Sequence, residues 1–353
     1  MTVVWTQWPD LNLPAGITHL PTDGIAPAPG DLDKVEFYVP RYMGGPAAIA
    51  MIPEMKSLKI IQSPNAGVDD VLKIRPDGVT LCNAAGVHDA STAELAVALA
   101  IASRRGFADF AADQAVQRWA HERKPSLTDS NIAIVGHGNI GKMIAKMLAN
   151  FEVTVTSFSR SGKDGALTFD HFDRLLPTFD VIILIVPLND QTRHLMNAQR
   201  LAAMKNGAAL VNVARGPVVD TDALIAELNS GRITAGLDVT DPEPLPSDHP
   251  LWKARNVIIT PHVGGDSEAF TPRGRKLVEE QLARYAKHPR KNRVLQRRGQ
   301  DSNNLQIPWE KPGFQNEAAQ NPTRAIAPFG SEVASRKNAT FPCCRTNKHT
   351  VEW

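Results

Sequence analysis

The sequence predicts an α/β protein whose parallel sheets are covered by helices on both faces. From residue 130 onward, apolar β-rich segments alternate with helical segments, and strands separated by helices pair in parallel within one sheet. Several of these strands are apolar without interruption, as in "VIILIV", which indicates burial on both faces. A chain of 353 residues is also long enough for two domains. We therefore expect doubly wound parallel sheets in two domains.

The first hundred residues contain three short apolar segments that are separated by turns. These segments, predicted as strands, are 35–39, 58–63 and 78–83. A long buried helix is predicted over 91–105 because Ser91 and Glu94 have the spacing of a capping box, and a dense apolar stretch follows them.

The second half repeats a strand–turn–helix pattern. The predicted strands are 131–136, 151–158, 180–188, 208–214, 233–239 and 256–265. The predicted helices are 142–150, 197–207, 220–231 and 277–289. Glycine closes two of these helices, at Gly207 and Gly231, as is common at helix ends.

The composition is that of an ordinary globular protein, with 42% hydrophobic and 22% charged residues. No apolar segment approaches the roughly 20 residues that span a bilayer, and the N-terminus lacks the basic and apolar regions of a secretory signal. The three cysteines form neither a disulfide framework nor a metal-binding pattern. We expect a cytoplasmic protein that binds no structural metal and does not associate with membranes.

The basic residues are concentrated near the C-terminus. Residues 288–353 have a net charge of +6 against +2 for the whole chain, so the first 287 residues carry −4. The same segment is rich in Asn, Gln and Pro and has no periodicity, which is typical of disorder. We expect an atypical, disordered tail. Nucleic-acid binding would depend on "RKNRVLQRR" alone, and a solvated tail is the simpler interpretation.

A glycine-rich turn joins the predicted strand at 131–136 to the helix after it. Gly136, Gly138 and Gly141 have the spacing G-x-G-x-x-G. The first glycine permits a tight turn, the second lets a pyrophosphate approach the backbone, and the third lets helix and strand pack closely. A tight turn without a ligand is the alternative. The strand before it and the helix after it favour a dinucleotide site.

The end of the next strand indicates which dinucleotide is bound. An acidic residue that accepts hydrogen bonds from the ribose of NAD is expected there, but the chain has Ser159, Arg160 and Ser161, with Lys163 close by. Guanidinium and hydroxyl groups donate hydrogen bonds to a phosphate. The sequence predicts a preference for NADP(H), with NAD(H) as the alternative.

Three polar residues follow later strands, at the edge where ligands bind in such sheets. They are Arg215, Glu243 and His262. A guanidinium can hold a substrate carboxylate or polarise a keto oxygen. An imidazolium can protonate that oxygen as a hydride arrives, and a carboxylate can orient the imidazole and favour its charged form. Each residue alone is ordinary, but together they suit the reduction of a 2-keto acid.

These residues and several motifs resemble the D-isomer-specific 2-hydroxyacid dehydrogenases. The motifs occur in the family's order: "SPNAGVDD", "GVHDASTAE", "GHGNIG", "VPLNDQT", "VNVARGPVVD" and "TPHVGG". The resemblance extends from about residue 55 to about residue 287, and "LDVTDPEPLPSDHPLW" is similar to the glyoxylate/hydroxypyruvate reductase branch. It implies two Rossmann-like or flavodoxin-like domains with an active-site cleft between them.

The resemblance also implies domain boundaries, ligands and a homodimer. Residues 1–95 would bind the substrate, residues 96–287 would bind the cofactor, and subunits would pair through the cofactor domain. Arg215, Glu243 and His262 would form the catalytic triad. The backbone near Ala66 and Gly67 would bind the substrate carboxylate. The residues implied along the cofactor are Asn139, Ile140, Val186, Pro187, Val213 and Asp238, the last of them near the nicotinamide carboxamide.

Two other functions fit the same fold. Formate dehydrogenases resemble this family but carry Gln where this chain has Glu243. Transcriptional corepressors with this fold sense dinucleotides without catalysis, and they can keep the triad. One departure concerns the fold: the family's chain returns after the last cofactor-domain helix to close the substrate domain. The helix at 277–289 resembles that last helix, but the segment after it does not resemble the return.

Overall fold

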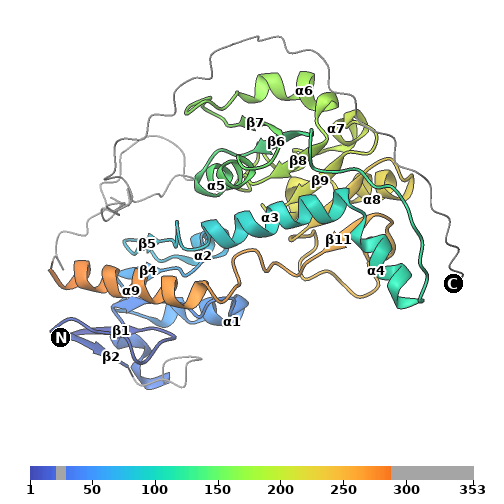
Figure 1. Ribbon diagram of the computed structural model, residues 1–353. Coiled ribbons are helices and arrows are strands. Elements are labelled where there is room, and N and C mark those ends of the chain that lie inside the picture. The colour runs from blue at the N-terminus through green and yellow to red at the C-terminus, as the bar shows by residue number, and fades with distance from the viewer. Residues whose placement is uncertain (21–28, 288–353) are drawn as a thin grey trace, which may run out of the picture. The chain divides into compact units, whose positions relative to one another are not determined.

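The computed structural model describes residues 1–20 and 29–287. Within these residues the chain forms two sheets, and every pair of neighbouring strands is parallel (Figure 1). The predicted fold class, two doubly wound Rossmann-like sheets, is confirmed. The predicted tail over 288–353 lies outside the described residues.

The first sheet has the strand order β2-β1-β3-β4-β5. Its strands are β1 (Thr2–Trp5), β2 (Ile17–His19), β3 (Phe37–Tyr38), β4 (Ile60–Gln62) and β5 (Thr80–Cys82). The last three lie within segments predicted as strands. The first two are not predicted from the sequence, and β2 contains one apolar residue among its three.

The second sheet has the strand order β11-β10-β9-β8-β6-β7. Its strands are β6 (Asn131–Val135), β7 (Thr154–Phe158), β8 (Val181–Leu184), β9 (Ala209–Asn212), β10 (Thr234–Leu237) and β11 (Val257–Ile259). All six predicted strands are confirmed, although each is shorter than its segment. The chain leaves β6 towards β7 on one side and later returns to β8 on the other, which places the topological switch point at the end of β6.

The helices connect and cover these strands. They are α1 (Gly45–Ala50), α2 (Asp69–Ile74), α3 (Asp89–Arg104), α4 (Phe107–Ala115), α5 (Asn139–Leu148), α6 (Phe172–Leu175), α7 (Ala198–Ala203), α8 (Thr221–Asn229) and α9 (Phe270–Lys287). Short 3-10 helices lie at Pro29–Lys34, Ile52–Glu54, Phe169–His171, Leu176–Thr178, Gly216–Val218 and Pro250–Lys253. None of the helices in the described ranges is both long and apolar enough to cross a membrane.

The helix α3 begins two residues earlier than predicted. Its N-cap is His88, whereas the capping-box spacing predicts Ser91. The hydroxyl of Ser91 instead contacts the hydroxyl of Ser267, with the two oxygens 2.8 Å apart. The capping-box prediction is therefore wrong, because a tertiary contact takes the hydroxyl that local spacing assigns to the backbone.

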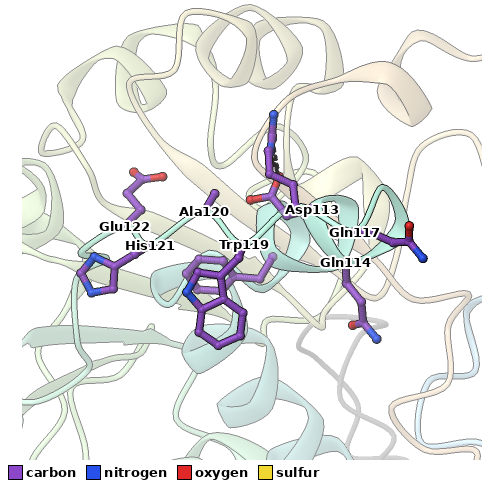
Figure 2. Close-up of a pocket in the computed structure, with 9 residues that line it drawn as sticks. Asp113, Gln114, Gln117, Trp119, Ala120, His121 and Glu122 are labelled. Carbon is purple, nitrogen blue, oxygen red and sulfur yellow. Dashed lines mark hydrogen bonds and ion pairs between the residues drawn. The ribbon is translucent and has the colours of Figure 1, made fainter. Parts of the chain in front are cut away.

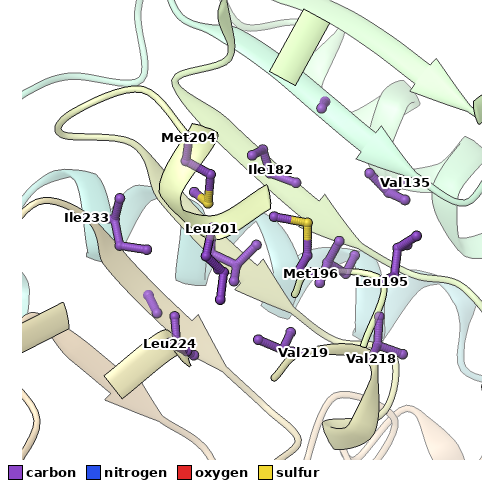
Figure 3. Packing of buried hydrophobic residues seen from close by; sticks show 14 of the residues in the cluster. Val135, Ile182, Leu195, Met196, Leu201, Met204, Val218, Val219, Leu224 and Ile233 are labelled. Carbon is purple, nitrogen blue, oxygen red and sulfur yellow. The ribbon is translucent and has the colours of Figure 1, made fainter. Parts of the chain in front are cut away.

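Both faces of the second sheet are buried, and alternate residues of each strand serve different cores. Ile132 and Ile134 of β6 pack with α3 and α5. Ala133 and Val135 face the opposite core with α6, α7 and α8, which includes Leu201 (Figure 3). This arrangement explains the uninterrupted apolar strands, because side chains alternate between the two faces of a strand.

The last helix, α9, packs against the first sheet. Val278, Leu282 and Tyr285 are buried in one cluster with apolar residues of β1, β3, β4 and β5. Arg275 also pairs with Asp10 at 2.8 Å. The helix that resembles the end of the cofactor domain therefore makes the return to the first sheet itself. The domain boundaries at residues 95 and 287 stay a prediction.

Candidate active site

The three predicted catalytic residues follow neighbouring strands of the second sheet. Arg215 comes shortly after β9, Glu243 after β10 and His262 after β11, and these strands lie side by side in the sheet. Because the strands are parallel, their carboxyl ends meet at one edge. This edge brings together side chains that are separated in the sequence.

His262 and Glu243 form a hydrogen-bonded pair. Nδ1 of His262 lies 2.5 Å from Oε1 of Glu243. Since an ionised carboxylate only accepts hydrogen bonds, Nδ1 carries the proton and Nε2 is left to face a ligand. About a third of each side chain is exposed, 34% for His262 and 38% for Glu243. The backbone of His262 is left-handed with φ of 54°, a conformation that clusters at functional sites in non-glycine residues.

The pKa of Glu243 lies below its ordinary value. Partial burial raises the pKa, but the hydrogen bond to His262 and the electrostatic attraction of His262 and Arg215 together outweigh burial. The carboxylate therefore stays ionised at neutral pH, and it can hold the imidazole in one orientation.

Asp238 supports the loop that carries His262. Its buried carboxylate accepts hydrogen bonds from the hydroxyl of Thr260 at 2.6 Å and from the amides of Val263 and Gly264, each at 2.9 Å. The amide of His262 also donates to the carbonyl oxygen of Asp238 at 2.8 Å. Asp238 thus lies directly under the loop. Its implied contact with a nicotinamide carboxamide stays a prediction.

Arg215 lies against the loop that is expected to bind the substrate carboxylate. A Cβ atom added to Gly67 would collide with Nη2 of Arg215 and would lie 2.8 Å from Cζ. Nε of Arg215 lies 3.4 Å from Oδ2 of Asp69, and Nη1 donates to the carbonyl oxygen of Ala214 at 2.7 Å. The structure therefore brings the segment at Ala66 and Gly67 together with the guanidinium.

The glycine-rich turn is closely packed at two glycines and open at the third. Gly136 has φ of 120°, and a Cβ there would overlap the carbonyl oxygen of Ile185. A Cβ at Gly141 would overlap the carbonyl oxygen of Gly136, whereas a Cβ at Gly138 would meet nothing within 4 Å among the described atoms. Gly138 caps α5, and no side chain caps that helix. A phosphate group fits this open helix N-terminus.

The other predicted cofactor residues lie along the same edge. Asn139 and Ile140 form the first turn of α5, Val186 and Pro187 follow β8, and Val213 follows β9. Their places at the carboxyl ends of adjacent strands suit an extended dinucleotide.

The loop after β7 presents the residues expected at the adenosine ribose. Arg160 and Ser161 are exposed. The hydroxyl oxygen of Ser159 accepts a hydrogen bond from the amide of Gly162 at 3.0 Å, so it shapes the loop and keeps its own proton free to donate. Lys142, from α5, pairs with Asp164 at 2.5 Å. The loop is therefore basic on its outer side and is tied to the helix of the glycine-rich turn.

Two residues near the site have no role that the sequence alone predicts. Asp69 is one, in the motif "SPNAGVDD". His88 is the other: its ring nitrogens contact the carbonyl oxygens of Pro64 at 2.8 Å and Gly265 at 3.1 Å. It therefore links the segment before Gly67 to the loop after His262. Both residues stand inside recognisable motifs, but a motif does not show which distant residue each one contacts.

Known proteins of one family are similar to this chain in sequence. Residues 97–264 match the profile of the D-isomer specific 2-hydroxyacid dehydrogenase NAD binding domain. A hydroxypyruvate reductase of Thermotoga maritima is 35% identical over 236 residues, which cover 64% of this chain and 77% of that protein.

Two solved structures of the same family superpose well. One, from Aeromonas salmonicida, has a TM-score of 0.70 and 26% identity, and the match covers 81% of this chain and 96% of that one. The other, from Xanthobacter autotrophicus Py2, was solved with NADPH and MES; its TM-score is 0.64 at 28% identity over 81% of this chain and 95% of that one.

The chain therefore belongs to the D-isomer specific 2-hydroxyacid dehydrogenase family. It is an oxidoreductase of hydroxy acids that uses a nicotinamide dinucleotide.

Proposed function

We propose that the protein is an NADP(H)-dependent reductase of small 2-keto acids, of the glyoxylate or hydroxypyruvate type, with His262 as the acid/base. The observation that carries this proposal is the pair between Nδ1 of His262 and Oε1 of Glu243, 2.5 Å apart, at the sheet edge that also holds Arg215 against Gly67. A hydrogen-bonded imidazole can protonate a carbonyl oxygen as a general acid, and a guanidinium can bind the carboxylate of an anionic substrate.

In this proposal the substrate carboxylate binds to Arg215 and to the backbone amides near Ala66 and Gly67. Nε2 of His262 donates its proton to the keto oxygen, and Glu243 stabilises the charged imidazole before the transfer. The dinucleotide, when bound, supplies the hydride that the keto carbon accepts. The product is a 2-hydroxy acid. His262 is left neutral and takes up a proton from solvent before the next cycle.

The preference for NADP(H) rests on the loop after β7. Arg160 and Ser161 are exposed there, and the loop contains no acidic residue until Asp164, which is paired with Lys142. A 2′-phosphate would meet donors and positive charge instead of a repelling carboxylate. The complex of the Xanthobacter relative with NADPH supports this choice.

The choice of substrate rests on the similarity to the Thermotoga hydroxypyruvate reductase. It also rests on the segment "LDVTDPEPLPSDHPLW", which contains Glu243 and resembles the glyoxylate/hydroxypyruvate reductase branch. Glu243 also argues against a formate dehydrogenase, because that family resembles this one but carries Gln at the position.

A homodimer is proposed from exposed apolar side chains on α4 and directly after it. Phe107, Val116 and Trp119 are 52%, 68% and 97% exposed. Trp119 lines a cavity of about 560 Å³ that is formed by α4 and the residues after it (Figure 2), and no residue of the triad lines this cavity. Large apolar side chains on one surface are typical of a protein–protein contact. A second copy of the chain is the partner we expect.

A panel of 2-keto acids assayed in parallel with NADPH and NADH tests the proposed function. The wild type should reduce glyoxylate or hydroxypyruvate faster with NADPH. His262→Ala should lower kcat by about 10²-fold or more, because it removes the proton donor, and it should leave NADPH affinity nearly unchanged.

His171→Ala, at an exposed histidine outside the site, is the control and should match the wild type. Wild-type turnover in His262→Ala would refute the assignment. Tight NADPH binding without turnover on any keto acid would favour a dinucleotide-sensing protein.

A further inference from the structure

Three groups surround the guanidinium of Arg215. Nη1 donates to the carbonyl oxygen of the neighbouring Ala214 at 2.7 Å. Nε faces Oδ2 of Asp69 at 3.4 Å. Nη2 lies against the backbone of Gly67, where a Cβ atom would displace it. The guanidinium is therefore held on two sides by groups of the chain, and its third nitrogen lies over the segment that is expected to bind the substrate carboxylate.

The three contacts contribute in different ways. Gly67 only leaves room for Nη2, since it has no side chain that could attract the guanidinium. The bond from Nη1 to Ala214 restrains the side chain from its own backbone. Asp69 is the group that attracts Arg215, because its carboxylate carries the opposite charge. It is the first residue of α2 and comes directly after the Gly67 segment. Without Asp69, the long arginine side chain would regain rotamer freedom that substrate binding must then remove.

Asp69 could in principle compete with the substrate carboxylate for Arg215. The geometry indicates otherwise, because Asp69 faces Nε whereas Nη2 is the nitrogen that lies over Gly67. A guanidinium has five N–H donors and can bind two carboxylates at different edges. Asp69 and a substrate can therefore occupy Arg215 at the same time.

We propose that Asp69 is a positioning residue that holds Arg215 over Gly67 in its substrate-binding orientation. The inference rests on the proposed function, because it assumes that Arg215 binds a 2-keto acid. In this scheme Asp69 touches neither substrate nor cofactor. Its removal should weaken substrate binding through Arg215 and should leave the chemical step unchanged.

The first test is the kinetics of Asp69→Asn, which removes the charge and keeps the shape. The pair is partly exposed, with 31% of the Arg215 side chain and 51% of the Asp69 side chain accessible, so the effect is modest. We expect KM for glyoxylate or hydroxypyruvate to rise about two- to fivefold, with kcat and the Kd of NADPH unchanged. Asp69→Glu keeps the charge and should recover most of the loss.

Asp70→Asn is the matched control. Asp70 is the next residue of the same helix, and its carboxylate accepts a hydrogen bond from the amide of Val71 at 2.8 Å. This variant should keep the wild-type KM. If it raises KM as much as Asp69→Asn does, the effect belongs to α2 in general and the proposal is wrong.

A double-mutant cycle shows whether Asp69 acts through Arg215. The Kd of oxalate for the enzyme–NADPH complex is measured for Asp69→Asn with Arg215 present and in an Arg215→Ala background. The weakening should appear only where Arg215 is present. Equal weakening in both backgrounds, or tighter binding in Asp69→Asn, would overturn the proposal. If the wild type reduces no 2-keto acid, the proposed function fails instead, and the oxalate cycle still reports on the link between the two residues.

Discussion

The turn after β6 and the loop after β7 lie at the same edge of the second sheet, but they are built in opposite ways. In the turn, Gly136 and Gly141 have no room for a side chain because backbone oxygens occupy the space. In the loop, Arg160 and Ser161 extend into solvent. Cofactor binding in the turn therefore depends on the absence of side chains, whereas cofactor choice in the loop depends on their presence.

This difference indicates that the two properties can change independently. A closely packed turn tolerates almost no substitution, since a change there disturbs the backbone itself. An exposed loop tolerates many substitutions at little cost in stability. Cofactor preference should therefore be easy to alter without losing dinucleotide binding.

The largest expected effect is that of Gly136→Ala. The new Cβ would overlap the carbonyl oxygen of Ile185, and φ of 120° is unfavourable for alanine. Strain of this kind costs about 1–3 kcal/mol. We expect a lower melting temperature and, if the strain is relieved by a shift of the turn that binding must reverse, about five- to 150-fold weaker binding of both NADPH and NADH. Thermal denaturation and fluorescence titration measure the two effects. Unchanged stability would show that the turn is less closely packed than the structure indicates.

Gly138→Ala separates the effect on cofactor binding from the effect on stability, because the added Cβ would meet no described atom within 4 Å. It should leave the melting temperature unchanged while weakening both cofactors, since the methyl group would occupy space that a phosphate needs. If both cofactors bind as in the wild type, the phosphate does not approach this glycine.

Arg160→Ala should have the next largest effect, and on one cofactor alone. Loss of a charge-assisted hydrogen bond costs about 1.5–3 kcal/mol, so NADPH should bind about ten- to a hundredfold more weakly while NADH changes little. Ser159→Asp should shift preference further towards NADH by repelling the phosphate. Arg174→Ala, at an exposed arginine of α6, is the control. Equal weakening of both cofactors by Arg160→Ala would show that this arginine only supports the loop.

The smallest expected effect concerns Asp164, which connects the two regions through its pair with Lys142 at 2.5 Å. Asp164→Asn removes a negative charge near the expected 2′-phosphate, so NADPH should bind about two- to threefold more tightly at low salt. The hydrogen bond from Lys142, and then its charge, lower the pKa of Asp164 below its ordinary value.

The pH dependence of this effect follows from the lowered pKa. The carboxylate stays ionised from about pH 8 to about pH 5, so the ratio of variant to wild-type affinity should stay above one over that range and should decrease only as the 2′-phosphate, whose second pKa is about 6, loses its second charge. A ratio that reaches one at about pH 5 would show that the carboxylate is protonated there.

The features that could be predicted from the sequence are local. The strands of the second sheet, the spacing of Gly136, Gly138 and Gly141, and the three residue types of the triad can be recognised because each depends on a short segment. Apolar strands buried on both faces and a glycine turn before a helix are set by backbone geometry within that segment.

Only the tertiary structure decided which distant segments meet. The contact of Asp69 with Arg215 and the link from His88 to Gly265, 177 residues further along the chain, depend on the order of strands in the two sheets. The return of α9 to the first sheet and the early start of α3 depend on the same packing. Local periodicity shows that a residue lies on a buried face, but the partner on that face comes from another part of the chain. That pairing is determined when the sheets and helices pack together.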